Sequence, residues 1–211
     1  MRSVRFSVVL GVLLLLTSRQ SLAGIPMPAT CNCPARITLV GSNAGVADAF
    51  GAFTLTVKDQ ANNPLSGASV VIDLALCSDI AICADQLDPG ATVNCAAKTT
   101  RKFTNIAGEV SFIVLGGSSG ASGVIAPPHT ARVFAGGVLL ASPTAAALDL
   151  DGSSGVGIND LSVWLGDFGA ASPHGRADFD GDDSVGINDL SVWLGAFGSQ
   201  GSARSCAVSC P

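Results

Sequence analysis

The chain of 211 residues contains no tyrosine, and aromatic residues make up only 5% of it. Glutamate occurs once, as Glu109. Glycosidases need two carboxylic acids that flank the scissile bond, and outside the acidic repeat described below the aspartates form no recognisable pair. The sequence also lacks a G-x-S-x-G nucleophile motif and a phosphate-binding loop. These absences predict a protein that is not an enzyme.

Basic residues are scarce as well. Eleven lysines and arginines stand against 16 acidic residues, and the formal net charge of −5 argues against a nucleic-acid partner. The acidic side chains are concentrated near the C-terminus, where nine aspartates lie between Asp149 and Asp189 with one arginine, Arg176. Acidic chemistry therefore belongs to that segment and not to the chain as a whole.

The only long apolar stretch is at the N-terminus. Arg2 and Arg5 precede an apolar run, Val8 to Leu16, and the small residue Ala23 follows Ser21 and Leu22. This arrangement is typical of a secretory signal peptide over residues 1–23. No later segment holds about 20 consecutive apolar residues, so we expect no membrane span. The predicted location is secreted, extracellular or at the cell surface.

Cysteine is present but in an odd number. In a secreted chain cysteines indicate disulfides first. A zinc site is less favoured, because no histidine lies near any cysteine and no C-x-x-C occurs. We expect three disulfides and one residual thiol, with the pairing left open between a local bridge in the middle group of three and bridges that join the two ends of the mature chain. The cysteines are Cys31, Cys33, Cys77, Cys83, Cys95, Cys206 and Cys210.

Between residues 36 and 145 the chain consists of short apolar runs and turns. Phe53, Leu55 and Val57 alternate with polar residues, as in a half-buried strand. Asn62-Asn63-Pro64 and residues 105–108 have turn composition. No segment here has a helical period with caps, so short strands at this spacing predict an antiparallel β-sandwich. The expected strands cover residues 37–40, 53–57, 69–76, 110–115 and the runs ARVFA and VLLA.

Two stretches in this region carry a family resemblance. VKDQANNPLSGASVVIDL, followed by TNIAGEVSFIVL, resembles the bacterial immunoglobulin-like repeats of invasin-type surface proteins. The resemblance implies an immunoglobulin-like β-sandwich over residues 36–145 that acts as a spacer or adhesive module. It covers about 80 residues, and the cysteine-containing insert from Cys77 to Cys95 departs from the simple repeat.

One motif occurs twice in the sequence. DLDGSSGVGINDLSVWLGDFG begins at Asp149, and DFDGDDSVGINDLSVWLGAFG begins 29 residues later at Asp178. Residues 149–160 (loop one) and 178–189 (loop two) fit a 12-residue calcium loop, which supplies oxygen ligands at positions 1, 3, 5, 7, 9 and 12. The candidate calcium ligands of loop one are Asp149, Asp151, Ser153, Gly155 and Asp160. Those of loop two are Asp178, Asp180, Asp182, Ser184 and Asp189.

Each loop leads into an amphipathic segment. Apolar residues recur at helical spacing from position 10 of the loop onward, and a glycine follows the last of them, which suits a helix end. Helices this short are marginal alone in water, so we expect the two to pack through equivalent apolar faces. These faces comprise Ile158, Leu161, Trp164, Leu165 and Phe168 in the first copy, and Ile187, Leu190, Trp193, Leu194 and Phe197 in the second.

The tandem pattern D-x-D-G-x-x-x-V-G-x-x-D-L, with no helix expected before either loop, resembles a type I dockerin domain over residues 148–198. The resemblance implies a small all-α module that binds two calcium ions and docks to a cohesin domain of a scaffold protein, as in polysaccharide-degrading complexes. The sequence departs from the family at Ser153 and Ser154 of loop one, at Asp183 of loop two, and at positions 10 and 11, which are Ile-Asn in both copies.

Because loop two offers four carboxylates and loop one only three, we expect calcium to bind more tightly in loop two. The leading interpretation is a secreted, non-catalytic calcium-binding interaction protein with a cohesin-type partner. Two alternatives stay open: a structural cell-surface or matrix protein in which calcium only stabilises the fold, and an accessory component of a polysaccharide-degrading complex. Cysteine-containing segments, residues 24–35 and 199–211, flank the two expected domains.

Overall fold

The computed structural model describes residues 24–119, 130–170, 175–206 and 210. The predicted signal peptide therefore lies outside the described residues. In the described part of the chain, no helix has the length and apolar character needed to cross a membrane.

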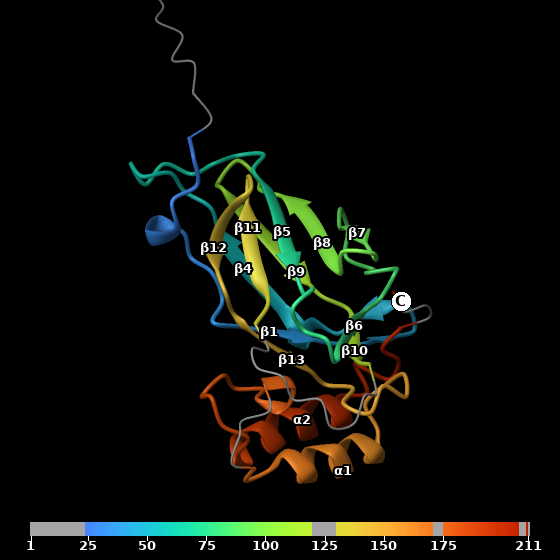
Figure 1. The fold of residues 1–211 in the computed structure, drawn as a ribbon. Coiled ribbons are helices and arrows are strands. Elements are labelled where there is room, and N and C mark those ends of the chain that lie inside the picture. The colour runs from blue at the N-terminus through green and yellow to red at the C-terminus, as the bar shows by residue number, and fades with distance from the viewer. Residues whose placement is uncertain (1–23, 120–129, 171–174, 207–209, 211) are drawn as a thin grey trace, which may run out of the picture.

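The structure confirms a mainly β region followed by a small helical part (Figure 1). The strands are β1 (Arg36–Leu39), β2 (Ser42–Asn43), β3 (Val46–Ala47), β4 (Ala52–Thr56), β5 (Ser69–Asp73), β6 (Ile80–Ile82), β7 (Thr92–Asn94), β8 (Thr99–Phe103), β9 (Glu109–Ile113), β10 (Gly116–Ser118), β11 (Arg132–Ala135), β12 (Val138–Ala141) and β13 (Thr144–Ala147).

The largest sheet has the strand order β12-β11-β5-β8-β7, and all its neighbours are antiparallel. It faces strands β4 and β9, which form an antiparallel pair. Alternation explains the layers, because Val70 and Ile72 of β5 are buried in the core while the alternate residues of the strand are partly exposed. Val110 and Phe112 of β9 contribute from the other side. The core therefore lies between two layers of strands.

One strand pair departs from the expected antiparallel arrangement. β1 and β13 run parallel, with Arg36 opposite Thr144 and Leu39 opposite Ala147. A parallel pair needs a long connection between its strands, and here nearly the whole β region lies between them. The pairing brings the start and the end of the β region together beside the helices.

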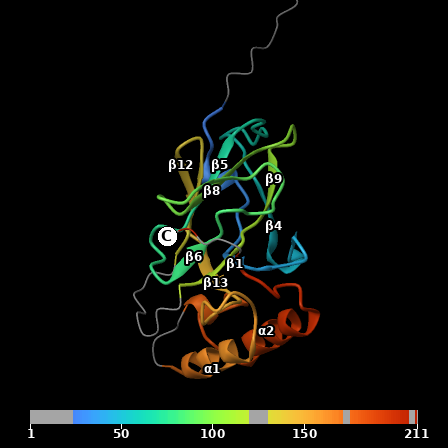
Figure 2. The same cartoon turned by 90° about the vertical axis from the view of Figure 1, so that its right-hand side faces the viewer.

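The helical part packs directly on this end of the β region (Figures 1 and 2). It contains α1 (Ile158–Asp167), the short 3-10 helix η3 (Gly175–Ala177) and α2 (Ile187–Ser199). Two further 3-10 turns, η1 (Pro28–Thr30) and η2 (Ala49–Gly51), belong to the β region. A second hydrophobic core joins the two parts: Val40, Ala146, Leu148, Leu150, Trp164, Ala177, Phe179, Val185, Trp193 and Ala196.

The C-terminal tail crosses back over the β region. Ser42 and Arg204 exchange backbone hydrogen bonds of 2.6 and 3.0 Å. Two disulfides, Cys83–Cys206 and Cys95–Cys210, attach the tail near β6 and β7. Neither expected pairing is therefore correct: the tail cysteines bond to the middle group, because the tail returns past β6 and β7.

The expected count of three disulfides with one thiol is also wrong. Cys31, Cys33 and Cys77 are free. Cys77 is buried in the core of the β region, while Cys31 and Cys33 are partly buried at its edge. Cys77 thus occupies the place of an ordinary apolar core residue.

Candidate metal centres

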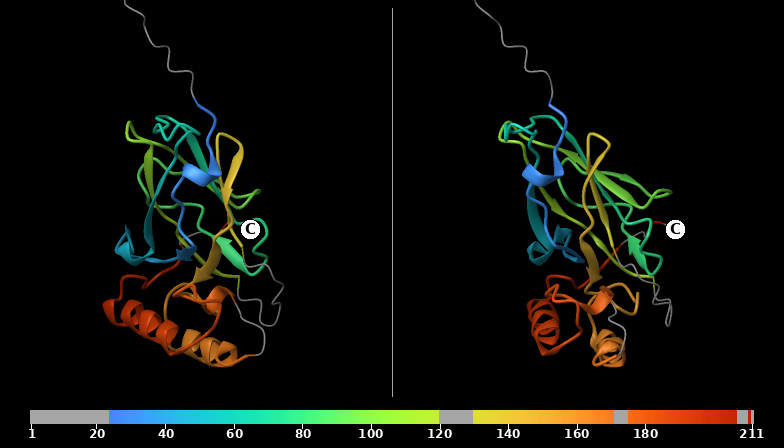
Figure 3. Two further views of the ribbon diagram at one scale, coloured as in Figure 1. Left: turned by 90° about the vertical axis from the view of Figure 1, so that its left-hand side faces the viewer. Right: turned by 60° about the vertical axis from the view of Figure 1, so that its left-hand side comes forward.

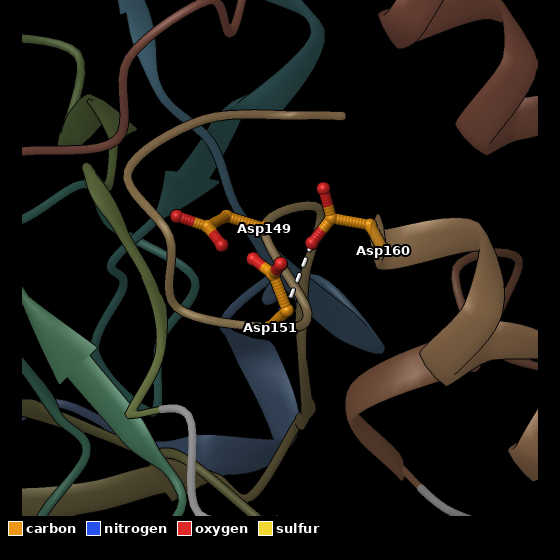
Figure 4. A group of neighbouring side chains, drawn as sticks. All are labelled: Asp149, Asp151 and Asp160. Carbon is orange, nitrogen blue, oxygen red and sulfur yellow. Dashed lines mark hydrogen bonds between the residues drawn. The ribbon is translucent and has the colours of Figure 1, made fainter. Parts of the chain in front are cut away.

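Loop one brings three carboxylates together (Figure 4). Asp149 and Asp151 lie at its start, and Asp160 is in the first turn of α1. One oxygen from each lies within 4.8 Å of the others. Oxygens that share one calcium ion can be at most about 5 Å apart, since each calcium–oxygen distance is about 2.3–2.6 Å. The cluster therefore has the spacing and the hard oxygen donors that calcium requires.

Asp149 and Asp160 also hold the loop in shape. The Asp149 carboxylate accepts hydrogen bonds from the backbone N–H groups of Gly152, Ser154 and Gly155 at 2.8–3.1 Å. The Asp160 carboxylate accepts bonds from Leu150, Asp151 and Gly157 at 2.6–2.9 Å. The bond to Gly157 caps the start of α1, since Gly157 is its N-cap residue. These two aspartates are therefore fixed by the fold before any cation is considered.

Loop two also holds a cluster of three carboxylates, with a different third member. Its cluster comprises Asp178, Asp180 and Asp182, with one oxygen of each within 4.8 Å of the others. Asp189 is not a member of that group, but it accepts backbone bonds from Phe179, Asp180 and Gly186 at 2.5–3.0 Å, as Asp160 does in loop one. Two copies of one motif thus form two equivalent loop–helix units.

Position 6 of each loop needs a left-handed backbone, which non-glycine residues adopt reluctantly. Ser154 has φ 78° and Asp183 has φ 66°. Position 4 is glycine in both loops, with φ 72° at Gly152 and 79° at Gly181. Both loops therefore make the same tight coil despite the serine in loop one.

The remaining candidate ligands lie on the same coils. Ser153 is exposed at position 5, and its N–H donates to Asp151 at 2.8 Å. Gly155 approaches the tail so closely that a Cβ placed on it would lie 2.2 Å from the Ala203 carbonyl oxygen. Ser184 donates through both its N–H and its hydroxyl to Asp182, at 2.9 and 2.6 Å. The Val156 N–H donates to the Ser202 carbonyl, so the tail lies against loop one.

The buried carboxylates are electrostatically unfavourable without a cation. Burial, together with the charge of Asp149, raises the pKa of Asp160 to about 6. Burial likewise raises the pKa of Asp149 and of Asp178. At the exposed rim the hydrogen bonds from Ser184 lower the pKa of Asp182. Charged carboxylates at such depth need a partner, and a divalent cation would supply one.

The helix faces differ from the expectation. Trp164 and Trp193 are buried, but they pack against the β region and the loops. The helices do not bury the rest of their apolar faces against each other, because the end of the β region lies on one side of both (Figure 3). Phe168 and Phe197 each stack on the tryptophan of their own helix, at 5.0 and 5.1 Å between ring centroids. The exposed residues are Ile158, Leu165, Phe168, Ile187, Leu194 and Phe197.

A basic residue that the sequence did not single out lies beside loop two. The Arg36 guanidinium of β1 packs on Gly181, where an added Cβ would lie 2.9 Å from Nη1. Burial lowers the pKa of Arg36, while Asp178, Asp180 and Asp189 act in the opposite direction. Arg36 is 142 residues before Asp178 in the sequence (178 − 36). The two residues come together because β1 pairs with β13, the strand that leads into the helical part.

No family model, curated protein or solved structure matches this chain.

Proposed function

We propose that the chain is a secreted, non-catalytic calcium-binding interaction protein, in which a dockerin-like module is attached to an immunoglobulin-like spacer. The observation that carries the proposal is that each copy of the repeat holds a cluster of three carboxylates, with loop positions 1 and 3 common to both clusters. Asp149, Asp151 and Asp160, with Ser153 and Gly155, would hold one calcium ion. Asp178, Asp180, Asp182, Ser184 and Asp189 would hold the other. The cations would supply the positive charge that the buried carboxylates lack.

The exposed helix faces support a docking role. Two equivalent apolar sets lie on α1 and α2, and Ile158 and Ile187 are 66% and 65% exposed. Exposed apolar residues that gather on one face are typical of protein interaction sites. We propose a cohesin-type domain as the partner, with calcium holding the helices in place for it.

One feature favours the structural alternative. The helical module shares a core with the β region, and its tail is bonded to that region by two disulfides. Calcium could then serve only to stabilise a single secreted body at a surface or in a matrix. In the docking proposal the exposed helix faces bind a partner, whereas in the structural alternative they bind none.

Binding of purified cohesin domains to the full chain, measured by biolayer interferometry, tests the docking proposal. We expect calcium-dependent binding that is weakened by Leu165→Glu and Leu194→Glu together. Thr54→Glu on the exposed side of β4 is the matched control and should leave binding unchanged. Absence of binding across the cohesin panel, in a chain that still binds calcium, would favour the structural alternative.

A further inference from the structure

The two loops are copies of one motif but lie on different parts of the β region. Beside loop one is the neutral strand β10: Ser118 donates its N–H to the Asp149 carbonyl at 2.7 Å, and a Cβ added to Gly117 would lie 3.0 Å from Asp149. Beside loop two is Arg36. A difference between the two sites thus comes from outside the repeat.

The Arg36 side chain is directed at loop two. Its Nε donates to Thr38 Oγ1 at 3.2 Å, whereas Nη1 is buried and has no hydrogen-bond partner. The guanidinium carbon Cζ would lie 3.8 Å from a Cβ on Gly181. Glycine at position 4 therefore leaves the space that the guanidinium fills, and the positive charge acts on Asp178, Asp180 and Asp189.

We propose that Arg36 lowers the cation affinity of loop two. Its fixed charge opposes an incoming divalent cation and offsets one of the four candidate carboxylates. With Arg36 counted, the five aspartates of loop two (178, 180, 182, 183 and 189) leave a net charge of −4 (1 − 5), against −3 from the three aspartates of loop one. The advantage that the carboxylate count gives loop two is thereby reduced. This inference rests on the proposed calcium function.

Calorimetric titration of calcium into the full chain carrying Asp151→Asn, which weakens loop one, isolates loop two. In that background Arg36→Gln should raise the calcium affinity of loop two about three- to tenfold at low ionic strength. The gain should shrink in about 0.5 M salt, where charges are screened over a few ångströms. Arg36→Lys should keep the lower affinity, because it keeps the charge.

Arg101→Gln is the matched control, since Arg101 is exposed on β8 and its loss changes the net charge equally. It should leave the affinity of loop two unchanged. Circular dichroism without calcium verifies that each variant is folded. An unchanged or lower affinity in Arg36→Gln would overturn the inference. A parent chain that binds no calcium in either loop would instead overturn the proposed function.

Discussion

At the scale of single residues, Asp160 links stability to pH. Its pKa rises from 3.8 to about 6 in the folded chain without calcium, chiefly by burial. The folded state therefore binds the proton more tightly than the unfolded state. The proton on Asp160 therefore stabilises the folded state. This contribution to the free energy of unfolding is fully present below about pH 4 and is lost as the pH rises through about 6. Urea unfolding in chelator should show this decline, and Asp160→Asn should reduce it.

Asp183→Asn is the control for that measurement, because Asp183 is exposed in loop two and asparagine tolerates its left-handed backbone. It should keep the slope of the parent chain. An unchanged slope in Asp160→Asn would show that Asp160 does not carry the pH dependence.

The free cysteines allow a second test at this scale. Burial, with a contribution from Asp79, raises the pKa of Cys77 to about 12, and burial raises that of Cys33 to about 11. Because the thiolate is the reactive form, Cys77 should be alkylated only slowly in the native chain. Denatured, unreduced protein should contain three thiols per chain. A count of one would mean that a third disulfide forms.

At the scale of elements, each helix is held by its tryptophan. Trp193 is 1% exposed in the core shared with the β region, whereas Leu194 is 49% exposed. Trp193→Ala should lower the free energy of unfolding by about 3–5 kcal/mol. Leu194→Ser should change it by about 0.5 kcal/mol or less. Chemical unfolding of both variants makes the comparison, and equal losses would contradict this division of the helix face.

The periodicity of apolar residues predicted the helices and the longer strands better than it predicted the short strands. The helices begin at Ile158 and Ile187, where the apolar spacing begins, and β4 and β9 lie within one residue of the expected starts. Strands of three residues, such as β6 and β7, are too short to show a period. Strand β8 was not predicted, because its sequence, TTRKF, is mostly polar. The spacing identified which residues share a helix face, but it could not tell which neighbour covers that face.

The carboxylates that gather in each loop could be predicted because they lie within two 12-residue segments. Arg36 could not, since its contact with loop two depends on strand pairing across the whole β region. The prediction of the disulfide pairing was wrong for the same reason. Sequence separation does not reveal that the tail returns to Cys83 and Cys95.

At the scale of the whole molecule, the tail joins the helical module to the β region. The Cys83–Cys206 bridge spans 123 residues of sequence. Cross-links that close long loops constrain the unfolded chain. Replacing both cysteines with alanine should therefore lower the free energy of unfolding by about 2–4 kcal/mol. Urea unfolding of the oxidised double variant checks this, and unchanged stability would mean that the backbone bonds between Ser42 and Arg204 are enough to hold the tail.

The central claim is that the two loops are calcium sites. Calorimetric titration of calcium into the full chain, after exhaustive treatment with chelator, tests it most directly. The account predicts two bound ions, with Asp180→Asn removing the tighter event and Asp151→Asn removing the weaker one, while Asp183→Asn keeps both. Loss of the tighter event in Asp151→Asn instead would reverse the predicted ranking of the loops. Absence of calcium binding by the folded parent chain would contradict the claim itself.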